Sequence, residues 1–439
     1  MFSQMPQNSL VLRARQLLTM QADTDALLQA PPAHDLDALR QRDARICGLI
    51  EDGAVHIQGP NLRFVGAWSD LDPKIKSRST VVEVGCVTPG WVDCHTHSVF
   101  AGSRHMEFTQ RNLGAQYLDI LNAGGGIHST VNAVRRSGRR ALAATLIGRC
   151  FEATRLGVTT LEVKSGYGLT TDEEIKQLRA VAEAAPEVLM ELHPTFLGAH
   201  VVPRKYADRR DDYVQMVIQE MIPKVAERGL ARYCDVFCDT GAFTAAEAEA
   251  ILRAGIDHGL IPRIHADELS HAGAAEVAAA VGAASADHLE YVSPEAIAAM
   301  AKANVVAVLL PMVNLFLKLP QHAPARDLIA AGVDVALSTD FNPGTGMTQD
   351  LGLIMTLACT HYGMTPAEAL LAITRNAARA LRLDDRGVLA KGKRADLTIL
   401  DVEDYWEIPY FPGRRPVAGV VWGGDVAYWT SAQELDDNA

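Results

Sequence analysis

The sequence predicts an α/β fold: a (β/α)8 barrel of the TIM type with a small β-sandwich domain that both ends of the chain build. Eight short apolar runs alternate with Ala- and Leu-rich helical patterns from residue 87 onward, which is typical of strands and helices around a parallel barrel. The segments before and after this region instead show short β-type runs between polar turns. A length of 439 residues leaves room for such a second unit, because a barrel typically needs about 250 residues.

The N-terminal region is predicted to be a small β-rich module. Residues 65–68 and 80–84 are short β-type runs between polar and Pro-containing turns. Residues 31–45 carry paired prolines and many charges, so we expect an exposed loop there.

The barrel is expected over residues 89–384, and its helices carry recognisable start signals. Residues 171–174, 244–247 and 365–368 each have the Thr-x-x-Glu pattern of a capping box. The last of these also has a proline at its first helical position. The eight expected strands are, in chain order, 87–97, 158–164, 188–200, 233–239, 262–268, 284–290, 305–311 and 334–340.

The chain returns to a β pattern after about residue 384. Residues 394–401 and 419–422 are short and strand-like. The simplest arrangement pairs this tail with the N-terminal module. We therefore expect residues 1–88 and 385–439 to form one small domain beside the barrel.

The charge balance favours a small-molecule partner. The chain has 41 Lys and Arg residues against 53 Asp and Glu residues, a net charge of −12. This balance argues against nucleic acid held by phosphate contacts and against a polybasic membrane-surface protein. The most apolar later stretch, 296–313, is interrupted by Lys302, Asn304 and Pro311, so we expect no membrane span there.

Cysteine usage and the N-terminus favour a cytoplasmic location. The seven cysteines are scattered, odd in number and without a CxxC pair, which suits a reducing compartment. The N-terminal segment lacks the continuous apolar core of a secretory signal. The sequence leaves a homodimer open.

Polar residues end several of the predicted strands, where the active site of a barrel forms. His95 and His97 end the first strand and point to the same side of it, because strand side chains alternate. His265 lies in the fifth strand and Asp340 ends the eighth. Three imidazoles and one carboxylate suit zinc or iron with a position open for water. Two histidines in a strand could also be core residues, but the four together predict a metal site.

The segments that carry these residues resemble the amidohydrolase superfamily and, within it, the imidazolonepropionases. This resemblance implies a hydrolase that uses one zinc or iron ion to open the cyclic amide of 4-imidazolone-5-propanoate, a small anion. The product would be N-formimidoyl-L-glutamate, in histidine degradation. The resembling segments are PGWVDCHTH, HADE, DHLE and STDFNPG for the superfamily, and FAGSRHMEF, KSGYGL, FLGAH and DFNPGT for the narrower family.

The resemblance also implies which side chains act. The metal ligands would be His95, His97, His265 and Asp340. The substrate-binding residues would be Arg104, Tyr167, His200, Glu268, Asn342, Gly344 and Thr345.

Three residues are predicted to be catalytic: Glu268, His288 and Asp340. Glu268 is placed to move a proton from water to the leaving nitrogen, although a cap or surface carboxylate is the alternative. His288 would polarise the carbonyl oxygen, help to deprotonate the water, or merely support Asp340. The choice of general base between Glu268 and His288 stays open.

Arg104, Tyr167 and His200 have plainer alternatives as well. Arg104 could clamp the propanoate carboxylate with two parallel hydrogen bonds, or be a surface arginine. Tyr167 lies between two glycines, which frees its ring for a ligand but also fits an ordinary turn. His200 would donate to the ring carbonyl or the carboxylate, or be a core histidine.

Lys164 separates one-metal from two-metal sites. Two-metal members of the superfamily use a carbamylated lysine, expected at the end of the fourth strand, whereas Lys164 ends the second. We therefore expect a single ion and a structural or electrostatic role for this lysine.

Two other functions compete with this interpretation. One is deamination of a nucleobase-like heterocycle by a related amidohydrolase, which would not need the cation of Arg104. The other is a non-catalytic metal-binding barrel, in which the metal would bind without hydrolysis.

Overall fold

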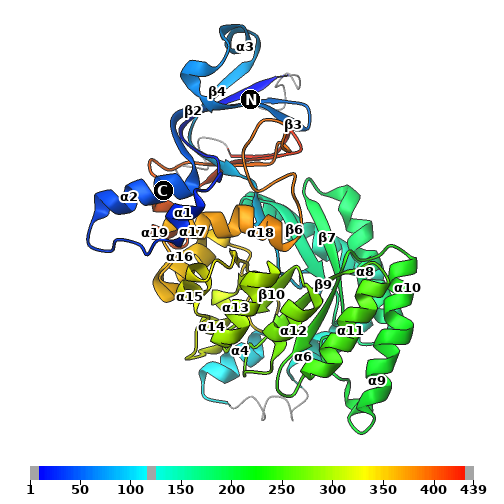
Figure 1. The fold of residues 1–439 in the computed structure, drawn as a ribbon. Coiled ribbons are helices and arrows are strands. Elements are labelled where there is room, and N and C mark those ends of the chain that lie inside the picture. Colours follow the sequence, from blue (N-terminus) through cyan, green and yellow to red (C-terminus); the bar gives the residue numbers. More distant parts are fainter. Residues whose placement is uncertain (1–8, 116–124, 431–439) are drawn as a thin grey trace.

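Eight parallel strands form the central sheet of the computed structural model, which describes residues 9–115 and 125–430 (Figure 1). Each strand pairs with its neighbours in chain order. Beyond the first and last strands, the His97 N–H donates to the Phe341 carbonyl at 3.1 Å, which closes the barrel. The expected (β/α)8 barrel is therefore confirmed. Its strands are β5 (Trp91–Asp93), β6 (Val158–Lys164), β7 (Glu191–Ala199), β8 (Tyr233–Cys238), β9 (Ile261–Ala266), β10 (Ser285–His288), β11 (Val306–Leu309) and β12 (Val335–Leu337).

Helices surround the barrel and follow its strands (Figure 1). They bury one apolar side against the sheet, as the Ala- and Leu-rich patterns predict. The longer ones are α6 (Ile127–Arg136), α7 (Arg139–Arg155), α8 (Thr171–Ala184), α11 (Ala245–Asp257), α13 (Pro294–Ala303) and α16 (Leu351–Tyr362). The shorter ones are α4 (His105–Asn112), α9 (Arg210–Met216), α10 (Ile222–Glu227), α12 (Ala274–Val281), α14 (Pro311–Leu317), α15 (Ala325–Ala330), α17 (Pro366–Leu371) and α18 (Ala377–Ala380).

Two of the three predicted capping boxes are confirmed. Thr244 caps α11 and Thr365 caps α17, each in a reciprocal box with the glutamate three residues on. The third was wrong: α8 has no side-chain cap, and Thr171 Oγ1 instead donates to Glu220 at 2.8 Å. The Glu174 side chain does not reach back to the helix start, because it accepts hydrogen bonds from backbone N–H groups of the preceding loop.

Both ends of the chain build a second, seven-stranded mixed sheet, as expected. Blue N-terminal and red C-terminal strands lie side by side in Figure 1. Strand β13 (Leu397–Leu400) of the C-terminal part pairs with β4 (Thr80–Pro89) of the N-terminal part. Side chains from both ends share one buried core, which includes Leu12, Val55, Leu397 and Val421. The domain boundaries at residues 88 and 385 stay a prediction. The strands are β1 (Leu10–Leu18), β2 (Leu49–Gln58), β3 (Asn61–Ala67), β4 (Thr80–Pro89), β13 (Leu397–Leu400), β14 (Val417–Trp422) and β15 (Asp425–Trp429).

The predicted first barrel strand is divided between the two sheets. Residues 87–89 belong to β4 of the terminal sheet, and β5 of the barrel begins only at Trp91. The change occurs at Gly90, where a Cβ atom would overlap the side chain of Thr159. The close approach of these strands requires glycine there.

The expected exposed loop at 31–45 was wrong in its second half. Helix α2 (Leu36–Cys47) begins after Asp35, which accepts from the Ala38 N–H, and ends at Gly48 with φ of +58°. Arg42 is buried against the barrel, where it pairs with Glu368 of α17 at 2.6 Å. A partner so distant in sequence could not be seen in the local pattern. The short helices α1 (Thr24–Leu28), α3 (Pro73–Arg78) and α19 (Glu407–Tyr410) complete the terminal parts.

No helix within the described ranges is long and apolar enough to span a bilayer.

Candidate active site

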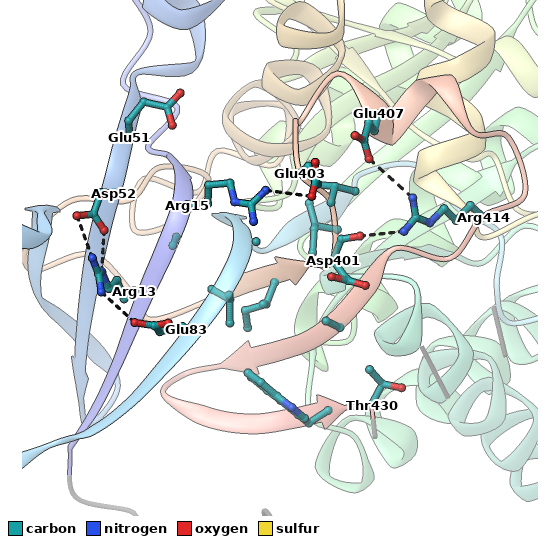
Figure 2. Close-up of a pocket in the computed structure, with 18 residues that line it drawn as sticks. Arg13, Arg15, Glu51, Asp52, Glu83, Asp401, Glu403, Glu407, Arg414 and Thr430 are labelled. Carbon is teal, nitrogen blue, oxygen red and sulfur yellow. Dashed lines mark hydrogen bonds and ion pairs between the residues drawn. The ribbon is translucent and has the colours of Figure 1, made fainter. Parts of the chain in front are cut away.

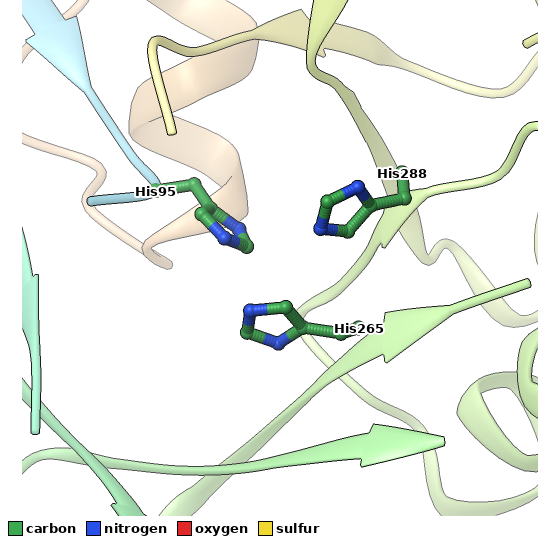
Figure 3. Close-up of side chains that lie close together, drawn as sticks. All are labelled: His95, His265 and His288. Atoms are coloured by element: carbon green, nitrogen blue, oxygen red, sulfur yellow. The ribbon is translucent and has the colours of Figure 1, made fainter. Parts of the chain in front are cut away.

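Three histidines and an aspartate converge at the carboxyl ends of the barrel strands. His95 and His97 follow β5, His265 lies in β9, and Asp340 follows β12. Figure 3 shows the rings of His95 and His265 pointing toward one another, with His288 of β10 beside them. Because the ends of parallel strands meet at one rim, His95 and Asp340 come close together here although they are 245 positions apart.

The nitrogen and oxygen atoms of this cluster fit a metal ion. Asp340 Oδ1 lies 3.5 Å from His95 Nε2 and 3.4 Å from His97 Nε2. His265 Nε2 lies 3.4 Å from His97 Nε2. His95 Nε2 and Asp340 Oδ1 are buried without a hydrogen-bond partner among the described residues. Buried lone pairs that face one another are costly unless a cation lies between them, so this donor set could hold zinc or iron.

Carboxylates behind two of the rings determine which ring nitrogens face the centre. Asp287 accepts from His95 Nδ1 at 2.6 Å, and Asp235 of β8 accepts from His265 Nδ1 at 3.0 Å. Since a carboxylate accepts, the proton lies on Nδ1 and the Nε2 lone pair points to the centre, as in metal-ligating histidines. Burial lowers the pKa of His95 and His97 well below its usual value, which keeps both rings in the neutral ligand form.

Sequence reasoning gave no role to Asp235 and missed the function of Asp287. Both side chains are fully buried in the barrel. The available signal was a single charged residue in an otherwise apolar strand, as in YCDVFC, because such a charge must have a buried partner.

Lys164 lies within this buried charge layer rather than among the ligands. Its Nζ is 2.9 Å from Glu162 and 2.8 Å from Asp235. Burial opposes its charge, but Asp235 and Glu162 outweigh that effect and raise the pKa of Lys164. A lysine carbamate forms from the neutral amine, and the ion pairs of Lys164 with Glu162 and Asp235 disfavour that form. The expectation of a structural or electrostatic role agrees with these contacts.

Glu268 and His288 lie next to each other beside the ligand cluster. Glu268 Oε2 is 3.7 Å from His288 Nε2, and the His288 ring centroid is 5.4 Å from that of His265. Burial raises the pKa of Glu268 well above its usual value, and the nearby carboxylates of Glu290 and Asp340 add to this. Glu268 therefore retains a proton more readily than an exposed glutamate, which suits a group that passes protons.

Tyr167 and His200 form an aromatic wall against His97. The rings of His97 and His200 stack at 5.1 Å, and Tyr167 lies 5.4 Å from His200. His200 Nδ1 is 3.1 Å from the Gly166 carbonyl, which only accepts, so Nδ1 carries the proton. Burial and then His265 lower the pKa of His200 to about 3. The neutral ring thus presents an acceptor at Nε2, the opposite of the donor that the sequence suggested.

Arg104 reaches the turn after β12 from the other side of the site. Its guanidinium forms an ion pair with Glu107 at 2.8 Å and lies against Gly344, where a Cβ atom would overlap its Nη1. Asn342 Oδ1 accepts from the N–H groups of Gly344 and Thr345 at 2.7 and 2.9 Å, which shapes this turn. The structure therefore brings all the predicted substrate-binding residues to the same rim as the ligands.

An open groove also lies on the terminal sheet (Figure 2). Its arginines are engaged: Arg13 pairs with Asp52 at 2.7 Å, and Arg15 with Glu403 at 3.4 Å. Carboxylates line it, but no histidine is among its described lining residues, whereas histidines converge at the barrel rim. We therefore place the active site at the barrel rim.

Comparison with known proteins shows the family of this chain. The family described as "Amidohydrolase family" matches residues 86–427. A curated imidazolonepropionase of Geobacillus kaustophilus is 46% identical over 95% of this chain and 97% of its own length. The chain belongs to the imidazolonepropionases of the amidohydrolase family. The imidazolonepropionase of Myxococcus xanthus is 44% identical over 89% of this chain and 92% of its own.

Two solved structures share the fold of this chain. A triazine hydrolase from Arthobacter aurescens superposes with a TM-score of 0.70 over 98% of each chain at 17% identity. An adenosine deaminase from Xanthomonas campestris with bound zinc gives a TM-score of 0.67, covering 98% of this chain and 96% of its own, at 18% identity. At such low identity these likenesses establish the architecture alone, namely a barrel with a second sheet.

Proposed function

We propose that this chain hydrolyses the cyclic amide C–N bond of 4-imidazolone-5-propanoate and yields N-formimidoyl-L-glutamate in histidine degradation. The observation that carries the proposal is the position of Arg104 at the same rim as the four-donor cluster, since a hydrolytic centre then lies next to a carboxylate-binding cation. The full-length likeness to curated imidazolonepropionases supports the same substrate.

His95, His97, His265 and Asp340 would hold one zinc or iron ion. Such an ion supplies a Lewis acid for the carbonyl oxygen and lowers the pKa of water to about 7. The charged state of Lys164 supports one ion rather than two.

The remaining residues bind the substrate and move protons. Arg104 holds the propanoate carboxylate, and the turn from Asn342 to Thr345 encloses the bound molecule. Tyr167 packs against the ring, while His200 Nε2 accepts a hydrogen bond from a ring N–H. These contacts hold the carbonyl carbon in a fixed position, which lowers the entropic part of the barrier.

In the reaction the carbonyl carbon gains a hydroxyl group from water, the ring C–N bond breaks, and the ring nitrogen takes a proton. Glu268, whose pKa is raised, receives the proton of water and returns it to the nitrogen. His288, which contacts Glu268, helps to orient that carboxyl group or polarises the carbonyl oxygen.

The test is an ultraviolet assay of imidazolone loss with purified protein of measured metal content. We expect loss of the imidazolone with metal-loaded protein, no loss after chelation, and recovery on adding zinc or iron. Deamination of adenine or cytosine derivatives without imidazolone loss would instead support the deaminase alternative. Metal binding with neither reaction would support a non-catalytic barrel.

We also propose a cytoplasmic location, which the seven free cysteines support, since an oxidising compartment favours disulfides. A homodimer stays a prediction.

A further inference from the structure

We propose that Arg111 is a second substrate-binding cation, which together with Arg104 forms the subsite for the carboxylate group of the substrate. The identity of that anion rests on the proposed function. The argument depends on the position of Arg111 in α4, its contact with the turn after β12, and the charge balance of this corner.

Helix α4 presents three charged side chains to the same region. Arg104 immediately precedes the helix. Glu107 and Arg111 lie within it, three and seven residues after Arg104. Residues at this spacing share one face of an α-helix. Glu107 is the buried member, at 8% exposure, whereas its helix neighbours Met106 and Phe108 are exposed.

Both arginines reach Gly344. Arg111 Nη2 donates to the Gly344 carbonyl at 3.0 Å, and Arg104 Nη1 lies against the glycine's Cα. Gly344 is four residues from Asp340, whose Oδ2 accepts from Thr345 of the same turn at 2.9 Å. The two guanidinium groups therefore border the turn that connects this corner with the ligand cluster.

The charge of Arg104 is already matched. Glu107 accepts from Arg104 Nε at 2.9 Å and pairs with its Nη2 at 2.8 Å. Glu107 also accepts from the Gly126 N–H at 3.1 Å, which fixes the carboxylate in place. Together Arg104 and Glu107 are neutral, so they orient hydrogen bonds without giving the corner a net positive charge.

Arg111 supplies that positive charge. Among the described residues, no carboxylate lies within ion-pair distance of its guanidinium, and none offers a hydrogen-bond partner to its buried Nε. Burial and the neighbouring Arg104 lower the pKa of Arg111, but it stays charged because an arginine starts near 12.5. A carboxylate bound between the two arginines would neutralise the corner and fill the unused donor positions.

This assignment explains how a chain of net charge −12 binds an anion. The average field of the protein repels the substrate, so attraction has to come from local groups. With Arg104 compensated by Glu107, Arg111 is the source of that attraction at the carboxylate end.

The experiment compares two ligands on metal-loaded protein: imidazole-4-propanoate and its uncharged propanamide. Dissociation constants are measured by calorimetry for wild type, Arg111→Gln, Arg111→Lys and the control Arg253→Gln. Arg253 is an exposed arginine of α11 paired with Glu249, so its loss changes the net charge equally. Thermal unfolding verifies that each variant is folded.

We expect Arg111→Gln to weaken the carboxylate ligand by about 10- to 100-fold, the range of a lost charged hydrogen bond, and the amide ligand by less than about threefold. Arg111→Lys should recover part of the affinity, and Arg253→Gln should match wild type. Equal weakening of both ligands would mean that Arg111 only shapes the Gly344 turn, which overturns the proposal, as would an unchanged preference for the carboxylate. Failure of the proposed function differs, because wild type would then not open the imidazolone ring.

Discussion

Asp235→Asn tests whether the buried carboxylates prepare the histidines for metal binding. In the wild type each oxygen of Asp235 has one partner: Oδ1 accepts from His265 Nδ1 at 3.0 Å and Oδ2 from Lys164 Nζ at 2.8 Å. An asparagine keeps only one oxygen. The other position becomes an NH2 group, which must face either a charged ammonium or the Nδ1–H of the imidazole.

We expect the one amide oxygen of the asparagine to accept from the Lys164 ammonium rather than from His265 Nδ1. Lys164 Nζ is fully buried and charged, so a donor turned toward it would leave that charge without a partner on β8. The amide NH2 then faces His265 Nδ1, which can accept only if the ring proton moves to Nε2. That is the nitrogen which points to His97, so the new tautomer blocks a candidate metal ligand.

The magnitude follows from the loss of one oriented ligand. Removal of a carboxylate behind a ligating histidine typically weakens metal binding by about 10- to 100-fold, or about 1.4–2.7 kcal/mol. The assay is competition for zinc between apo-protein and a chromophoric chelator of known affinity. Asp334→Asn is the control, because Asp334 pairs with Arg379 at the surface. A dissociation constant for Asp235→Asn within twofold of wild type would refute the tautomer argument.

Three further predictions concern groups that do not bind the metal. Arg42→Met should lower the free energy of unfolding by about 1.5 kcal/mol in urea titrations, because the buried Glu368 carboxylate loses its 2.6 Å partner but keeps Arg326 at 2.8 Å. Glu174→Gln should reduce kcat/KM about tenfold or more in steady-state assays. The Glu174 carboxylate accepts hydrogen bonds from three loop N–H groups, and the NH2 group of glutamine would face one of these donors without being able to accept from it. Glu191 interacts with His193 and Arg386, which together lower the pKa of Glu191 to about 2, so its stabilising effect is present above about pH 4.5 and lost as the pH falls toward 2. Glu191→Gln should therefore destabilise the protein by about 1 kcal/mol at pH 7, the value expected for a partly exposed pair, and by less at pH 3 in chemical denaturation.

Specific outcomes would contradict these three predictions. An unchanged urea midpoint for Arg42→Met would show that α2 is not held to the barrel by this pair. Wild-type kinetics for Glu174→Gln would remove its role in shaping the loop that carries Tyr167. A destabilisation by Glu191→Gln as large at pH 3 as at pH 7 would contradict the lowered pKa.

Local patterns in the sequence determined the order of elements and the residue types at the site. Eight apolar runs became the eight barrel strands, because burial on both faces requires short continuous apolar segments. His95 and His97 share a side because neighbouring strand residues alternate. The two capping boxes at Thr244 and Thr365 depend on contacts within four residues, which a sequence shows directly.

Long-range partners were beyond the sequence. The failed capping box at Thr171 and the unexpected helix α2 both reflect competition from distant groups, Glu220 in one case and Glu368 in the other. A segment with many charged residues is expected to be exposed unless buried partners are known for its charges. The segment that contains Arg42 was therefore predicted to be an exposed loop.

The sequence by itself predicted which candidate metal ligands and proton-transferring groups lie at the rim of this barrel. Only the tertiary structure decided their surroundings. Asp235 and Asp287 accept hydrogen bonds from His265 and His95, Lys164 forms an ion pair with Asp235, and Arg111 donates to the Gly344 carbonyl. The physical reason is that these contacts join residues 30 to 233 positions apart, which the folding of the barrel brings together.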